Sequence, residues 1–329
     1  MLKLGIIGTN WITKMFVEAA KKTAKYELVA VYSRRAETGQ KFAEDFTDVV
    51  QIFTDIDAFL KSGIDVVYIA SPNSLHFAQA KAAIEADVNV IVEKSAFDNI
   101  KQYEEIHSLM RQHPKVRLFE AARHVQQDNF KLLAQQVAKM EHISGATLIY
   151  EKYSSRFDAY LAGEEPNVLS KQFAAGALTD LGVYPIYAAV KLFGLPQEQH
   201  YFATLLNNGA DGRGTVILRY PKFDVTIIFG KGSNSYEHSE ILGYRDTILI
   251  DSIAELTDIK YDDGQGNVTV ISQPVLDNPM IPEADLFAKI MLDPLENDSI
   301  YHDLEILSQR VNIVLTELRK SAGIEFATD

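Results

Sequence analysis

The chain has 329 residues, of which 47% are hydrophobic and 23% charged, a composition typical of soluble globular proteins of about two domains. Its 32 basic and 45 acidic side chains give a net charge of -13, which disfavours binding to the phosphate backbone of nucleic acids. The chain has no cysteine, which excludes disulfides, thiolate zinc sites and iron–sulfur clusters.

The remaining features at this level argue against a membrane protein and against a metal site. No uncharged apolar run approaches the ~18 residues that cross a bilayer, and the N-terminus MLKLGIIGTNWI lacks the long apolar segment of a signal peptide. The eight histidines show no HxH or HExxH spacing. We therefore expect a cytoplasmic protein without a metal, a membrane partner or a nucleic-acid partner.

Residues 1–122 are predicted to form a dinucleotide-binding Rossmann domain. Short runs rich in β-branched residues, such as LKLGIIG, ELVAVYS and DVVYIAS, alternate with amphipathic stretches of helical length. This alternation is typical of βαβ units and a mostly parallel sheet. The strands are nearly continuous in apolar residues, which indicates a doubly wound sheet that helices cover on both faces.

The stretch GIIGTNWI lies at the first predicted strand-to-helix turn, where the fingerprint G-x-G-x-x-G/A of dinucleotide-binding proteins begins. Asn10 occupies the position of the second glycine, and Thr13 that of the third. Asparagine tolerates the left-handed backbone conformation better than most residues, so we expect the turn to survive. The predicted phosphate loop comprises Gly8, Thr9, Asn10, Trp11 and Ile12.

The end of the second predicted strand distinguishes between cofactors. An NAD site carries Asp or Glu there to bind the ribose 2′-hydroxyl, whereas this chain has Ser33, Arg34 and Arg35. A hydroxyl and two guanidinium groups suit a 2′-phosphate, so we predict NADP as the cofactor. Two alternatives remain open: NAD as the cofactor, and a solvated helix start that holds no nucleotide.

Glu93 and Lys94 follow the buried strand pattern of VNVIV directly. Charged side chains are rarely buried unless they are paired or functional. In an α/β fold the carboxyl ends of the strands border the ligand. The two residues are therefore either a strand-end ion pair or part of a site.

Two spaced motifs resemble those of the Gfo/Idh/MocA oxidoreductase family. The segment IASPNSLHF, followed about twenty residues later by EKS, is similar to that family's Ser-Pro-Asn-x-x-His turn and Glu-Lys-Pro motif, and AAGALTDLGVY is similar to its Gly-Gly-Gly-Ala-Leu-x-Asp-x-Gly-x-His/Tyr motif. The resemblance covers essentially the whole chain. It implies cofactor contacts from the following matched positions: Ser71, Pro72, Asn73, His76, Glu93 and Lys94.

The resemblance also implies a catalytic role for Lys94, as proton donor or as electrostatic stabiliser of the reacting oxygen. Asp180 and Tyr184 match positions that face the substrate, and their spacing of four places them on one face of a helix. Tyr184 is expected to relay a proton or to bond the reacting oxygen, with Asp180 positioning a hydroxyl or the tyrosine. Arg123 matches a position near the substrate, and His124 follows it.

Residues 123–329 are predicted to form an α+β domain that binds the substrate. Seven strand-like runs between Tyr201 and Ser272 are separated by turn signals such as DGRG and DDGQGN, which indicates a large open, mostly antiparallel meander. Helices can cover only one face of this sheet, so we expect a homodimer through the other face. The loop RFDAYLAGEEPNVLSKQF contributes Arg156, Tyr160 and Lys171 as further expected ligand contacts.

Three positions depart from the family pattern: Asn10, Ser95 in place of the proline after Lys94, and Ala174-Ala175 in place of two glycines. Loss of the proline predicts loss of a cis peptide bond beside Lys94. The sequence thus predicts an NADP-dependent oxidoreductase that moves a hydride between nicotinamide and a sugar, polyol or cyclic diol, or its carbonyl form. The alternatives are an NAD-dependent enzyme of the same class and a non-catalytic nucleotide-binding sensor on this fold.

Overall fold

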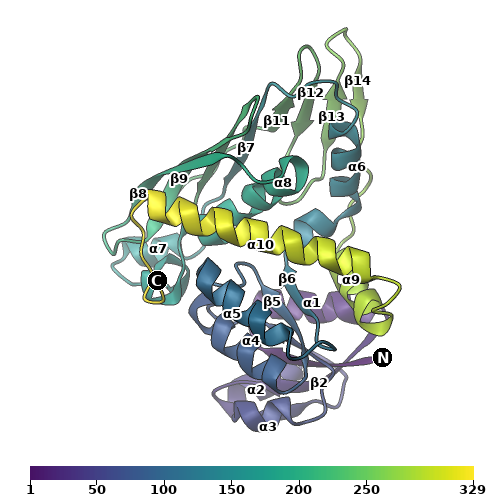
Figure 1. The fold of residues 1–329 in the computed structure, drawn as a ribbon. Coiled ribbons are helices and arrows are strands. Elements are labelled where there is room, and N and C mark those ends of the chain that lie inside the picture. The colour runs from purple at the N-terminus through teal and green to yellow at the C-terminus, as the bar shows by residue number, and fades with distance from the viewer. The chain divides into compact units, whose positions relative to one another are not determined.

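The computed structural model describes residues 1–329, which form two compact units (Figure 1). The first unit comprises Met1–Ala121 and Leu276–Ile306, and the second comprises Ala122–Val275 and Leu307–Asp329. None of the helices combines the length and the apolar surface needed to cross a lipid bilayer.

The first unit is a doubly wound Rossmann domain, as the strand and helix alternation predicts. Its six strands are all parallel, in the order β3-β2-β1-β4-β5-β6. In chain order the elements are β1 (Leu2–Ile7), α1 (Trp11–Lys22), β2 (Tyr26–Tyr32), α2 (Ala36–Ala43), β3 (Gln51–Phe53), α3 (Ile56–Leu60), β4 (Val66–Ile69), α4 (His76–Glu85), β5 (Asn89–Glu93), α5 (Ile100–Met110), β6 (Leu118–Ala121) and α9 (Ile281–Leu292).

Side chains on the two faces of this sheet belong to two separate hydrophobic clusters. Leu4 and Ile6 of β1 pack with Phe16 of α1 and with Phe287 of α9. Val67 of β4 lies in the opposite cluster with residues of α3, α4 and α5. Because both faces are covered, the strands can be apolar at nearly every position.

The helix α9 packs in the first unit, whereas the expected division of the chain placed residues 276–306 in the second domain. Phe287 of α9 stacks on Phe119 of β6 with ring centroids 4.6 Å apart. Lys25 forms an ion pair with Asp285, and the side chain of Asn278 donates to the carbonyl oxygen of Met15 at 2.8 Å. An amphipathic pattern shows that a helix has an apolar face but not which sheet it covers.

The second unit contains an eight-stranded, mostly antiparallel sheet in the order β14-β13-β12-β11-β7-β10-β9-β8. Its helices and turns include α6 (Asp128–Val137), α7 (Phe157–Leu161), a π turn η5 (Leu178–Gly182), α8 (Val183–Phe193) and the C-terminal part of α10 (Asp298–Ser321). Its strands are β7 (Gly145–Glu151), β8 (Glu198–Leu205), β9 (Asp211–Arg219), β10 (Asp224–Gly230), β11 (Ser239–Leu242), β12 (Thr247–Ile250), β13 (Ile259–Asp262) and β14 (Val268–Val270).

The seven strands predicted after residue 201 are all present, but they do not form one continuous meander. β7 lies between β10 and β11, parallel to β10 and antiparallel to β11. The expectation of a simple meander is therefore wrong at this point. Pairing with an earlier strand is a long-range contact that turn signals between neighbouring strands do not report.

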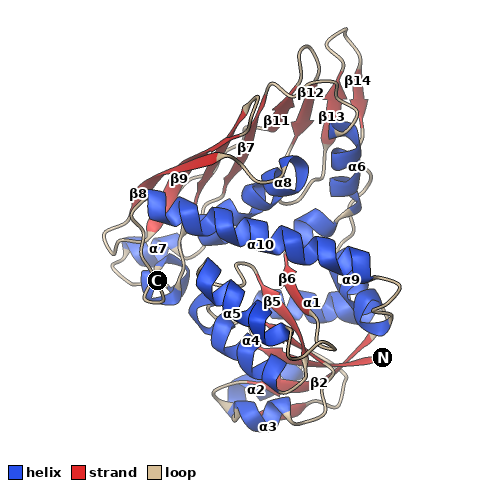
Figure 2. Ribbon diagram, in the orientation of Figure 1, coloured by secondary structure: helices blue, strands red, loops and turns tan.

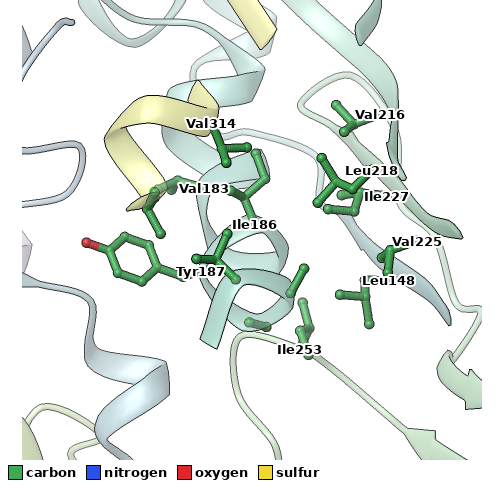
Figure 3. Packing of buried hydrophobic residues seen from close by; sticks show 14 of the residues in the cluster. Leu148, Val183, Ile186, Tyr187, Val216, Leu218, Val225, Ile227, Ile253 and Val314 are labelled. Carbon is green, nitrogen blue, oxygen red and sulfur yellow. The ribbon is translucent and has the colours of Figure 1, made fainter. Parts of the chain in front are cut away.

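Helices α6 and α8 lie on one face of this sheet (Figure 2). Figure 3 shows the core beneath α8, where side chains of the helix meet those of the inner sheet face. The labelled core residues are Leu148, Val183, Ile186, Tyr187, Val216, Leu218, Val225, Ile227, Ile253 and Val314. This packing fixes the helix that carries Tyr184 on a rigid sheet.

Candidate active site

The turn after β1 requires a glycine at position 8. Gly8 has a φ of +98°, and a Cβ at this position would lie 2.6 Å from the carbonyl oxygen of Ala70. Ala70 follows β4, the neighbour of β1 in the sheet. A side chain would therefore be both strained and obstructed, and the bare turn leads directly to the N-terminus of α1, where α/β folds bind phosphate groups.

The turn survives with Asn10, as expected, but Asn10 does not use the left-handed conformation that asparagine tolerates. Its φ of -90° and ψ of 178° are extended, and its side chain caps α1 by accepting from the backbone N–H of Thr13 at 3.1 Å. Its amide also donates to the carbonyl oxygen of Ala70 at 2.8 Å. Asn10 thus fastens the start of α1 to β4, which a glycine could not do.

The other residues of the predicted phosphate loop differ in exposure. The side chain of Trp11, the only tryptophan of the chain, is 74% exposed at the first position of α1. Ile12 instead packs against the hydrophobic cluster under the sheet, and Thr9 is half-buried. Trp11 is therefore the most exposed apolar side chain of this segment.

Ser33, Arg34 and Arg35 lie at the carboxyl end of β2, as the sequence predicts. The backbone N–H of Ser33 donates a hydrogen bond to the carbonyl oxygen of Phe53 at 3.0 Å. This bond holds the turn against β3. Both arginine side chains are exposed, and no ion pair engages either guanidinium group. Two adjacent cations without acidic partners are available to bind an anion.

The turn after β4 contains Ser71, Pro72 and Asn73 and leads into α4. The hydroxyl of Ser71 donates to the side chain of Gln79 at 2.7 Å. Pro72 and Asn73 begin a short 3-10 turn and are half-buried at the carboxyl edge of the sheet. These three residues therefore border the edge where Gly8 also lies.

His76 is completely buried beneath this turn. Its Nε2 lies 2.9 Å from the carbonyl oxygen of Ser71, and its Nδ1 lies 3.1 Å from that of Ser95. Burial and, to a lesser extent, the charge of Lys94 lower the pKa of His76 to about 4, although the two carbonyl groups act to raise it. A neutral ring has one N–H and can donate to only one of these two carbonyl groups, so the buried His76 lies between the turn after β4 and the residue after Lys94 with a single hydrogen bond to one of them.

Glu93 and Lys94 end β5 next to this bridge. The hydroxyl of Tyr68 donates to Glu93, and the ring of Tyr68 stacks on Phe16 with centroids 3.9 Å apart. Glu93 is buried, whereas Lys94 is half-buried. The strand therefore holds the carboxylate inside and brings the ammonium group to its carboxyl edge.

The peptide bond between Lys94 and Ser95 is cis. The expectation that replacement of proline removes a cis bond here is therefore wrong. The next N–H group, of Ala96, donates to the side chain of Glu120 in β6 at 3.0 Å. The backbone after Lys94 is thus fixed by His76 on one side and by Glu120 on the other.

In the second unit, Arg123 and His124 both contact Tyr184. The guanidinium group of Arg123 donates to both carboxylate oxygens of Glu255, at 2.6 and 3.1 Å, and lies 5.8 Å from the centre of the Tyr184 ring. Burial opposes the charge of Arg123, but Tyr184 and Glu255 raise its pKa above the usual range. The Nε2 of His124 lies 2.9 Å from the carbonyl oxygen of Tyr184.

Asp180 and Tyr184 lie on either side of the junction between the π turn η5 and α8. π turns are rare and occur often at functional sites. Tyr184 is half-buried, with its ring edge-to-face against Tyr150 of β7 at 5.2 Å. Asp180 forms an ion pair with Lys231, the residue after β10.

The start of this helical segment is held by Asp211 at the beginning of β9. Its carboxylate accepts from the N–H of Leu178 and from the hydroxyl of Tyr201, both at 2.6 Å. Burial raises the pKa of Asp211, although these hydrogen bonds and the charge of Lys231 oppose the shift. A Cβ at Gly176 would lie 1.8 Å from Asp211, which explains why the motif needs glycine there.

The three residues expected from the loop after β7 have unequal surroundings. The hydroxyl of Tyr160 accepts from the N–H of Asn207 at 3.0 Å, and the side chain of Lys171 lies against Gly209. Arg156 is exposed. Tyr160 and Lys171 thus anchor the loop between β8 and β9 in this structure.

No motif in the sequence marks Lys231, Glu255 or Asp211. Lys231 continues the alternation of inward-facing residues Val225, Ile227 and Phe229, so a lysine at that position of the pattern was a readable signal. Glu255 and Asp211 lie in segments far from their partners and carry no such mark. No group of acidic and histidine side chains in the structure is arranged to hold a metal ion.

The chain resembles known oxidoreductases over its whole length. Residues 2–121 match the model of the oxidoreductase family with an NAD-binding Rossmann fold, Gfo/Idh/MocA. The oxidoreductase YgjR of Escherichia coli is 38% identical over 330 residues, covering 100% of this chain and 99% of the relative. The scyllo-inositol 2-dehydrogenase (NADP(+)) IolU of Bacillus subtilis is 36% identical over 333 residues, with the same coverage.

Among solved structures, the 3-ketoreductase KijD10 of Actinomadura kijaniata in complex with NADP and TDP-benzene has a similar fold. Its TM-score is 0.84 at 18% identity, covering 97% of both chains. At this identity the likeness describes the fold only. The two-unit architecture and its order along the chain are thus shared with a known oxidoreductase.

Proposed function

Because the chain belongs to the Gfo/Idh/MocA family and is an oxidoreductase, we propose that it uses NADP to oxidise or reduce a CH–OH group of a sugar or polyol. The observation that carries the choice of cofactor is the pair Arg34 and Arg35, whose guanidinium groups have no acidic partner at the end of β2. The relative IolU is named for NADP(+), which supports the same choice.

The turn at Gly8 fits the pyrophosphate of such a cofactor. The position lacks room for a Cβ, and the backbone then turns into the N-terminus of α1. Backbone N–H groups at a helix start bind phosphate oxygens. We assign the pyrophosphate to the segment from Gly8 to Ile12 and the 2′-phosphate to Ser33, Arg34 and Arg35.

The substrate class follows from the relatives and from the polar groups of the second unit. IolU is named as a dehydrogenase of scyllo-inositol, a cyclic polyol, and 36% identity over the whole chain makes a polyol the first class to test. Asp180 and Tyr184 offer an acceptor and a hydroxyl group, which suit a ligand with several hydroxyl groups.

In the mechanism we propose, Lys94 binds the oxygen of the reacting carbinol and moves its proton. A bound nicotinamide supplies hydride chemistry, and proton movement on the substrate oxygen must accompany it. The ammonium group of Lys94 polarises a carbonyl in the reductive direction, and the amine takes the hydroxyl proton in the oxidative direction. In the second unit, we assign to Tyr184 a hydrogen bond with a substrate oxygen or the relay of a proton, and to Asp180 the orientation of a substrate hydroxyl group.

The open face of the eight-stranded sheet supports the proposal of a homodimer. Phe202 of β8 is exposed, and Ile149, Ile217 and Ile228 are half-buried on the face opposite the helices. Apolar patches of this kind usually mark a partner surface. Light scattering at micromolar concentration is expected to give twice the chain mass of 36.8 kDa, and a mass of one chain contradicts the dimer.

The proposed activity is tested by reduction of NADP in the presence of scyllo-inositol, other inositols and a set of aldoses, monitored by absorbance of the reduced nicotinamide. Turnover of at least one cyclic polyol or sugar is the expected result. Each substrate is also offered with NAD, because an enzyme that prefers NAD contradicts the assignment of Arg34. Tight cofactor binding without turnover of any CH–OH compound favours the sensor alternative.

A further inference from the structure

Lys231 is an almost fully buried lysine outside the motifs that identify the family. Its side chain is 1% exposed. Its N–H donates to the carbonyl oxygen of Gly212 at 2.9 Å, and its own carbonyl oxygen accepts from the N–H of Ser154 at 2.8 Å. Because the backbone is tied to segments on both sides, the direction of this side chain is fixed.

The inward direction of Lys231 follows from the strand that precedes it. Val225, Ile227 and Phe229 of β10 face the core beneath α8, and Lys231 is the next residue in this alternation. At that position an aliphatic side chain would be the ordinary choice. A lysine there places one positive charge inside the second unit, where an isolated ion is costly.

Two carboxylates surround this charge. Lys231 forms an ion pair with Oδ2 of Asp180, and its charge also acts on Asp211. Asp211 is engaged by Leu178 and Tyr201, so it holds the start of η5. The direct partner of the buried ammonium group is therefore Asp180, which lies within η5 itself.

The pair is asymmetric in its exposure. The ammonium group is hidden, whereas the side chain of Asp180 is 37% exposed. A molecule that approaches this segment therefore meets an oxygen acceptor and not a cation.

We propose that Lys231 is a positioning residue for Asp180, whose carboxylate it holds in place as the acceptor of a hydrogen bond from a substrate hydroxyl group. The inference rests on the proposed function for the identity of the substrate. It makes Asp180 a fixed acceptor that does not exchange a proton during the reaction. Lys231 itself acts only through Asp180 and contacts no reacting atom.

The test is a double-mutant cycle of Lys231→Met and Asp180→Asn in the full-length protein. With scyllo-inositol and NADP, each single variant is expected to lower kcat/KM by about tenfold or more, mostly through KM for the polyol. Adding Lys231→Met to Asp180→Asn should change kcat/KM by less than about threefold. Independent, multiplying losses would overturn the inference.

Two variants control for structural effects. Lys222→Met removes an exposed lysine from the turn before the same strand and should leave kcat/KM unchanged. Lys231→Gln retains a hydrogen-bond donor without the charge and serves where Lys231→Met does not fold. The KM for NADP should stay constant in all of them, and a parallel loss of cofactor affinity would show general damage and contradict a positioning role.

A thermal-unfolding cycle with the same variants needs no substrate. Loss of one partner leaves a buried charge unpaired, so the double variant should be destabilised less than the sum of the single variants. If the wild-type protein does not turn over scyllo-inositol, the proposed substrate fails while this cycle still reports on the pair. Additive losses of unfolding temperature overturn the pairing itself.

Discussion

His76 in the first unit and Asp180 in the second are both held by neighbours at predicted functional segments, but by opposite electrostatic means. His76 is neutral and fully buried between two backbone carbonyl groups. Asp180 is partly exposed and is bound to a buried ammonium group. The first arrangement depends on backbone geometry near the motif, and the second depends on a single charge from a distant strand.

This difference separates the tasks of the two segments. The carboxyl edge of the first sheet must present the same backbone groups to a cofactor that does not vary. Neutral hydrogen bonds fix these backbone groups without adding charge. A substrate segment must present chosen polar atoms, and paired charges such as Arg123 with Glu255 orient them. Pairing also makes the second arrangement sensitive to loss of either partner.

The largest expected effect is on Lys94. Replacing Lys94 by Met should lower kcat by about 1000-fold, because the proton on the substrate oxygen loses its carrier, while NADPH affinity changes little. Steady-state kinetics and a cofactor titration on the same preparation check both parts. Lys115→Met is the matched control, because Lys115 precedes β6 at the amino ends of the strands, opposite to Lys94. Equal losses of kcat in the two variants would refute the catalytic role of Lys94.

The neutral bridge at His76 predicts a dependence of stability on pH. The ordinary pKa of His is 6.5 and that of folded His76 is about 4, so between these values the unfolded chain binds a proton that the folded chain does not. The stability from His76 is complete above pH 6.5 and decreases by up to about 3 kcal/mol as the pH falls to 4.

Urea denaturation of the wild-type protein and of His76→Gln across this pH range measures that contribution. In His76→Gln, the free energy of unfolding should depend much less on pH between 4 and 6.5 than it does in the wild-type protein. His107, whose pKa burial also lowers to about 4, provides the comparison, because its side chain is 25% exposed and His107→Gln should remove less. An unchanged slope in His76→Gln would mean that the bridge is not neutral in the folded state.

The cofactor assignment predicts a smaller, selective effect at Arg34. Arg34→Ala should weaken NADPH binding by about 30-fold, the range for loss of a charged hydrogen bond, and leave NADH binding nearly unchanged. Lys41→Ala removes an equal charge from the exposed face of α2 and should affect neither. If Arg34→Ala weakened both cofactors equally, Arg34 would not read the 2′-phosphate.

The smallest expected effect is a difference in the free energy of unfolding between Gly8→Ala and Gly63→Ala. It distinguishes the cost of the backbone conformation at Gly8 from the cost of its steric contact. Gly8→Ala meets the carbonyl of Ala70, whereas Gly63, with a φ of +87°, has no atom within 4 Å of a new Cβ. Both substitutions incur the left-handed strain of about 1 kcal/mol, and Gly8→Ala should lose about 1 to 2 kcal/mol more. Equal losses in the free energy of unfolding would show that the turn adapts.

The first unit could be predicted from the sequence better than the second. The residues from Gly8 to Lys94 lie at the ends of successive strands, so the alternation of strands and helices already gathers them at one edge. The buried state of His76 was not predicted, because a histidine in a motif reads the same whether it contacts the ligand or its own backbone. The attachment of α9 was missed for the same lack of long-range information.

In the second unit, the helix with Asp180 and Tyr184 was identified from its motif, but its supports were not. Asp211 and Lys231 reach this segment through the pairing order of the sheet, which β7 interrupts, and Glu255 binds Arg123 from the connection between β12 and β13. Strand order depends on contacts between distant segments, and local sequence patterns do not determine them. Only the lysine in the apolar alternation of β10 offered a local signal.

Binding of NADP at the carboxyl edge of the first unit is the property on which the other proposed roles depend. Trp11 is the single tryptophan and stands at the start of α1, so energy transfer from it to a reduced nicotinamide reports binding without any label. Titration of the wild-type protein should show NADPH bound at least about 30-fold more tightly than NADH. Equal or tighter binding of NADH, or no binding of either, would contradict the central claim.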